Sequence, residues 1–123
     1  MKSLVFVFLG GGLGSSLRFL ISKYLNMANV AIPYGTLTVN VIGSFILGFV
    51  LGLTLKPDQI SNTAILFFAT GFCGGFTTFS TFAFENQMFL KTGDYFHFAL
   101  YSIGSLLFGF SAVFAGIFLS KYF

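Results

Sequence analysis

The chain has 123 residues, of which 56% are hydrophobic and only 7% are charged, and its mean hydropathy is +0.94. A soluble domain carries about 25% charged residues, and a small one leaves much of its surface in water, so this composition excludes an ordinary soluble protein. The net charge of +3 comes from scattered basic residues, too few for a nucleic-acid surface, and the single Cys73 excludes an internal disulfide or a cysteine metal cluster.

Four apolar segments are each long enough to cross a bilayer, which takes about 20 residues of α-helix. They run over residues 3–25, 32–55, 62–91 and 94–121, and short polar connectors join them. The sequence therefore predicts an all-α membrane protein that spans residues 1–123 as a single domain of four transmembrane helices.

The first segment carries a ridge of small residues, Gly10 and Gly14, followed one turn later by Arg18. Small residues at this spacing are typical of membrane helices that approach one another closely. Two compatible roles remain open for Arg18: it caps loop carbonyl groups, or it attracts anions into a vestibule.

A polar stripe marks the second segment, where Thr36, Asn40 and Ser44 follow one another at intervals of four and share a helix face. Ser44 continues into glycines at the same spacing, which favours helix packing. Asn40 differs, because an amide side chain near mid-membrane is costly unless it is bonded, and it has two N–H donors to offer an anion.

The third segment is longer than a bilayer requires, and residues 71–82 bring glycines and hydroxyl groups into its middle. Irregular backbone survives at membrane depth only where it is buried in protein or lines a wet cavity, and an interrupted helix is a pointer to a transport site. We predict two half-helices joined near the pair Gly74-Gly75.

Beyond that break, Phe79 and Phe82 point in neighbouring directions, with Ser80 between them. The edges of aromatic rings are electropositive, so ring edges together with hydroxyl and amide donors favour a small anion. Glu85 lies one turn further on, nearer the membrane surface.

Along the fourth segment, Tyr101, Ser105 and Gly109 share a face. The phenol and hydroxyl groups form either a donor track for an ion or hydrogen bonds between helices. The single histidine, His97, is predicted to serve packing, because one histidine makes no metal site.

The lysines give almost no preferred orientation. With four spans, Lys2, Lys56 and Lys121 fall on one side of the membrane, and Lys23 and Lys91 fall on the other. Loops rich in lysine and arginine normally stay in the cytoplasm, and three against two is nearly no bias. We therefore expect insertion in both orientations and an antiparallel homodimer, which would supply in two chains the inverted repeat of larger transporters.

Several motifs of this chain, taken together, resemble those of a known family. The run Gly-Gly-Phe-Thr-Thr-Phe-Ser-Thr-Phe at residues 74–82 is similar to the signature of the Fluc (CrcB) fluoride channels. The resemblance extends over the whole chain, through residues 10–14 with Arg18, residues 35–40 with Gly43, and the fourth-segment pair Tyr101 and Ser105. The chain departs from the family where Ser15 and Phe19 replace a common Ala and Tyr, and where Gly109 replaces a hydroxyl residue that some members carry.

The resemblance implies a dual-topology antiparallel homodimer with two pores, in the bacterial cell (inner) membrane, that exports cytoplasmic fluoride passively. It implies a structural sodium ion at the dimer centre, held by the main-chain carbonyl groups of Gly74 and Thr77 from both subunits. Glu85 would lie near the mouth of the path, close to the vestibule considered for Arg18. The fluoride path itself would be lined by Asn40, Phe79, Ser80, Phe82, Tyr101 and Ser105.

Other classes of protein fit less well. A proton-coupled small multidrug exporter has a similar length but places a carboxylate in its first helix, where this chain has only Arg18. A fluoride–proton antiporter would have to rely on Glu85, a lone acid without a relay. A non-transporting assembly subunit would explain the small-residue ridges but not Asn40. An enzyme is not expected, because no nucleophile, base and orienting group converge.

Overall fold

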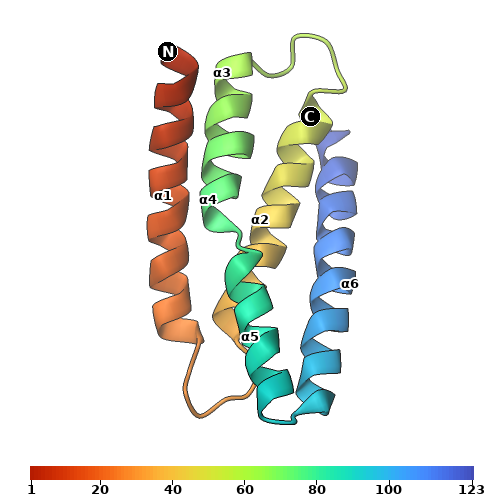
Figure 1. Cartoon of the computed structure of the whole chain (residues 1–123). Helices are drawn as coiled ribbons and strands as arrows, with labels where there is room; N and C mark the ends of the chain where they lie inside the picture. The colour runs from red at the N-terminus through yellow and green to blue at the C-terminus, as the bar shows by residue number, and fades with distance from the viewer.

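Four long helical segments run side by side in the computed structural model, which describes residues 1–123 (Figure 1). They are α1 (Lys2–Leu25), α2 (Tyr34–Leu53), a composite third segment over Asn62–Lys91, and α6 (Tyr95–Ser120). All four are long and apolar enough to cross a membrane, which confirms the predicted all-α, multi-pass fold. Their observed ends lie within two residues of the predicted spans.

Both termini and the loop between α2 and the third segment lie at one end of the bundle (Figure 1). The α1–α2 connector and the turn that leads into α6 lie at the other end. At the first end, the ammonium group of Lys56 donates to the carbonyl of Lys121 at 2.8 Å, so the loop and the C-terminus are joined. The lysines therefore divide between the two ends as the sequence predicts.

Small residues bring the helices into close contact. A Cβ atom on Gly48 of α2 would meet the carbonyl oxygen of Val113 on α6, and one on Gly116 of α6 would meet that of Phe45. A Cβ atom on Gly10 of α1 would likewise meet the backbone of the third segment at Phe67. The glycines at these positions are therefore needed for close approach between backbones, as membrane helix packing favours.

The third segment consists of α3 (Asn62–Ile65), a π-helical stretch η1 (Leu66–Cys73), α4 (Gly74–Phe76) and α5 (Ser80–Lys91). The interruption lies at Thr77–Phe79, where Thr77 is extended with ψ of 158°. This is just beyond the predicted point at Gly74-Gly75, because both glycines remain helical. Gly75 instead lies against α1, where a Cβ atom would meet the carbonyl oxygen of Gly11. The π-helical stretch was not predicted.

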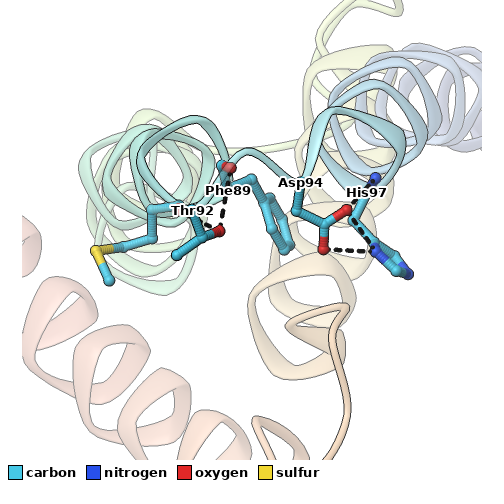
Figure 2. A network of polar contacts seen from close by, with 5 residues as sticks. Phe89, Thr92, Asp94 and His97 are labelled. Atoms are coloured by element: carbon cyan, nitrogen blue, oxygen red, sulfur yellow. Dashed lines mark hydrogen bonds and ion pairs between the residues drawn. The ribbon is translucent and has the colours of Figure 1, made fainter.

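A network of polar contacts closes the turn between α5 and α6 (Figure 2). The hydroxyl of Thr92 shares its single hydrogen between the carbonyls of Met88 and Phe89, at 3.0 and 3.2 Å, at the C-terminal end of α5. Asp94 caps α6 by accepting the N–H of His97 at 3.2 Å and also bonds the ring of His97 at 2.8 Å.

The N–H bond from His97 holds the pKa of Asp94 below its usual value. The charged cap is therefore fully present above the ordinary range of an aspartate and is lost only as the pH falls below that range.

Candidate functional site

The interrupted backbone is held by Asn40 of α2. Its Nδ2 donates to the carbonyl of Thr78 at 3.1 Å, and its Oδ1 accepts the N–H of Thr78 at 2.8 Å. The side-chain amide therefore pairs with both polar groups of one residue in the break, as a neighbouring peptide would. One of the two N–H groups of Asn40 remains for another acceptor.

Two carbonyl groups at the break lose their helical donors. The N–H of Thr78 donates to Asn40, and the N–H of Thr81 donates to the hydroxyl of Thr78 at 3.2 Å. In an uninterrupted helix these two N–H groups would donate to the carbonyls of Gly74 and Thr77. Neither carbonyl accepts a backbone hydrogen bond here. These are the two main-chain oxygens that the family resemblance implies as sodium ligands, and the break leaves both without a backbone donor.

A groove of about 450 Å³ runs along the break between α2 and α6. Among the predicted site residues it is lined by Asn40, Phe79, Phe82 and Ser105, together with Gly74 and Thr77. Tyr101 and Ser105 line a second hollow of about 200 Å³ beside it. Ser80 lines neither, although its hydroxyl lies 3.4 Å from that of Thr78. No lysine, arginine or acidic residue lines the larger groove.

Aromatic rings form a continuous series from the groove to the smaller hollow beside it. The ring centres of Phe79 and Phe82 are 6.1 Å apart, and those of Phe82 and Tyr101 are 5.1 Å apart, with both pairs tilted. Phe79 as a whole residue is 79% exposed, so little of the chain packs against it.

Ser105 is half-buried and lines both hollows, and its hydroxyl oxygen is buried without a hydrogen-bond partner. Most buried polar side-chain atoms in proteins have a partner, and a missing one costs free energy. A hydroxyl in this position fits a ligand that accepts a hydrogen bond.

Glu85 does not extend freely into a vestibule. Its Oε2 accepts the hydroxyl of Thr36 from α2, and its Oε1 accepts the phenol of Tyr101 from α6, both at 2.6 Å. Thr36 is 0% exposed. The sequence placed Thr36 on the same helix face as Asn40 but gave no sign of its bond to Glu85, because that bond depends on how three helices pack.

Arg18 contacts the third segment. Its Nε donates to the carbonyl of Gly75 at 2.9 Å, and the hydroxyl of Ser15 lies 3.4 Å from the same oxygen. Of the two roles left open, capping a carbonyl is the one for which the structure provides a contact. Ser15 adds a second donor to that oxygen.

These features define a multi-pass membrane protein built around an interrupted helix, with uncharged donor groups gathered at the interruption. The family model described as CrcB-like protein, Camphor Resistance (CrcB), matches residues 5–117. The chain belongs to this family.

Three relatives illustrate the similarity, and each is named fluoride-specific ion channel FluC. The protein of Gloeothece citriformis is 49% identical over 123 residues, which cover 98% of both chains. That of Chlorobium chlorochromatii is 43% identical over 114 residues, or 93% of this chain and 88% of the relative. That of Phocaeicola vulgatus is 43% identical over 122 residues, which cover 98% of this chain and 100% of the relative.

Proposed function

We propose that this chain is a fluoride-selective channel that lets cytoplasmic fluoride leave a bacterial cell passively across the inner membrane and so lowers fluoride toxicity. The observation that carries the proposal is the buried, unpartnered hydroxyl of Ser105 in a groove that is also lined by the rings of Phe79 and Phe82 and by Asn40. The names of the relatives agree with it.

The groove suits a small anion for a physical reason. An ion that leaves water needs donors in place of its hydration shell, and conduction also requires that binding be weak enough for release. Hydroxyl groups, an amide N–H and ring edges supply partial positive charge without a full cationic charge to trap the ion. No lysine or arginine lines the groove, which agrees with passage rather than storage.

Purified protein in liposomes should release fluoride down its gradient and exclude chloride. We expect fluoride efflux to exceed chloride efflux by at least about a hundredfold, because only the smaller ion makes short contacts with all the donors, each hydrogen bond contributing about 1 kcal/mol. An ion-selective electrode measures both fluxes. Equal chloride flux, or an obligatory exchange of fluoride for protons, would contradict the proposal. The second result would favour an antiporter.

We further propose an antiparallel homodimer as the conducting form. The groove at the break is open along one side of the single chain, and the carbonyls of Gly74 and Thr77 lack donors there. A second copy, inverted relative to the first, would close the groove. The near-equal division of lysines between the two ends agrees with insertion in both orientations.

A reporter fused after Phe123 should then appear on both sides of the membrane. Adding two lysines beside Pro57, in the loop after α2, should force one orientation and remove most of the fluoride efflux, because no inverted partner remains. Co-expression with a copy biased in the opposite orientation should restore it. A reporter found on one side only, in a fully active protein, would rule out the antiparallel dimer.

We also propose a sodium ion between the two copies, held by the carbonyls of Gly74 and Thr77 from each subunit. Carbonyl oxygens suit a hard cation, and these two have no other backbone donor. When bound, the ion would neutralise the carbonyl dipoles that face one another across the interface. It would be structural rather than transported.

A further inference from the structure

Asn26, in the connector between α1 and α2, makes three hydrogen bonds with the start of α2. Its Oδ1 accepts the N–H groups of Gly35 and Thr36 at 2.7 and 3.2 Å. The first N–H groups of a helix have no partner within the helix, so Asn26 caps α2 from outside it. These two bonds also fix the orientation of the amide group: Oδ1 faces the two N–H groups, and Nδ2 is left to donate to a different acceptor.

That Nδ2 donates to the hydroxyl oxygen of Thr36 at 3.2 Å. A hydroxyl has a single hydrogen to donate. Because its oxygen is engaged by Asn26, the hydrogen of Thr36 goes to Oε2 of Glu85, 2.6 Å away. Thr36 is fully buried, so water does not compete for either bond.

The second oxygen of Glu85 accepts the only hydrogen of the Tyr101 phenol. Tyr101 lies beside Phe82 and lines the smaller hollow together with Ser105. To donate to an ion in the path, the phenol must therefore leave Glu85. The carboxylate then depends on Thr36 alone to remain where it is.

We propose that Asn26 is a positioning residue for fluoride conduction, and this inference rests on the proposed channel function. By engaging the hydroxyl oxygen of Thr36, Asn26 directs its hydrogen onto Glu85 and anchors the carboxylate against α2. Tyr101 can then turn to the anion without drawing a negative charge into the path. Without the hydrogen bond from Thr36, the carboxylate of Glu85 stays bonded to Tyr101 and repels the ion.

Asn26→Asp separates capping from orientation. Aspartate keeps the acceptor oxygen for the N–H groups of Gly35 and Thr36, but it has no N–H donor for the hydroxyl of Thr36. In this variant the hydroxyl of Thr36 donates to the new carboxylate and no longer to Glu85. We expect fluoride efflux to fall about fivefold, the factor that corresponds to losing one hydrogen bond of about 1 kcal/mol. Thermal stability should stay close to that of the wild type, because the cap is kept.

Two matched variants accompany it. Asn29→Asp adds the same charge to the same connector at an exposed residue without a side-chain hydrogen bond, and it should leave efflux unchanged. Thr36→Val removes the hydroxyl and should lower efflux as Asn26→Asp does. The double variant should lower it no further, because both changes remove the same bond. Thr36→Ser, which keeps the hydroxyl, should restore the wild-type rate.

The carboxyl carbon of Glu85, labelled with ¹³C and observed by NMR in liposomes without fluoride, gives a readout that does not depend on transport. Its signal should move in Asn26→Asp and Thr36→Val and stay in place in Asn29→Asp. Wild-type efflux in Asn26→Asp, or reduced efflux with an unmoved Glu85 signal, would overturn the role of Asn26.

Two further outcomes separate this inference from the function on which it rests. If Asn26→Asp does not fold, equal efflux from Thr36→Val and Thr36→Ser would overturn the role of the anchor. A wild-type protein that releases no fluoride would overturn the proposed function and the conduction role with it, and the Glu85 signal would then report only the hydrogen bonds.

Discussion

Replacing Phe82 with isoleucine should reduce fluoride efflux by about 30-fold, because the ring edge is electropositive and its contact with a dehydrated anion should be worth about as much as a hydrogen bond to a charged group, about 2 kcal/mol. Isoleucine keeps an apolar side chain but removes the ring edge. Phe79→Ile should have a similar effect, since Phe79 is 79% exposed, lines the groove and contributes little to the packing of the single chain. Efflux from liposomes, measured beside the amount of folded dimer, tests both variants.

The matched control is Phe84→Ile. Phe84 lies on α5, close in sequence to Phe79 and Phe82. It is 64% exposed and does not line the groove. It should keep its full efflux. If Phe79→Ile and Phe82→Ile also conduct like the wild type, the two rings serve packing alone and the ring-edge account of anion binding is wrong.

The features that the sequence predicted are those that depend on local composition. Four spans follow from apolar length, and the packing ridges at Gly10 and Gly48 follow from small residues at helical spacing. The interruption of the third helix follows from hydroxyl groups and glycines at membrane depth. Its exact position did not, because Gly75 packs against α1 within a helical turn, and the amide of Asn40 holds the backbone open at Thr78.

The contacts that escaped prediction join distant parts of the chain. Glu85 bonds Thr36 and Tyr101, which are 49 and 16 residues away, and Arg18 bonds Gly75, which is 57 residues away. Such pairs depend on the rotation and register of packed helices, and no local pattern encodes these. Asn26 lies eight residues before α2 begins at Tyr34, too far for the sequence to mark it as the N-cap, which is the residue directly before a helix.

Two adjacent glycines distinguish packing within one chain from contact between chains. Gly75→Ala should prevent stable folding, because its Cβ atom would meet the carbonyl oxygen of Gly11 and lie 2.8 Å from the hydroxyl oxygen of Ser15. Overpacking of this kind costs about 1–3 kcal/mol, and here backbone atoms would have to move. The yield of folded protein after extraction in detergent measures this effect.

Gly74→Leu should behave differently. Gly74 is helical, with φ of −61°, and no atom lies within 4 Å of where its Cβ would be, so the single chain has room for a side chain. If two copies meet at this point around a sodium ion, leucine there should leave each chain helical but separate the dimer and abolish fluoride efflux. Circular dichroism and size-exclusion chromatography distinguish these states.

The proposed sodium site can be tested by its effect on the thermal stability of the dimer. The melting temperature of the wild-type dimer should rise with sodium and fall when a large organic cation replaces it, because ligand binding to the folded state stabilises that state. Gly74→Ala, which adds one methyl group near the proposed ligands, should show a smaller response, and Thr77→Ser should respond fully, because its carbonyl remains. A Gly74→Leu protein that still forms a conducting dimer stabilised by sodium would exclude this contact between subunits, and the free carbonyls would then belong to the groove of a single chain.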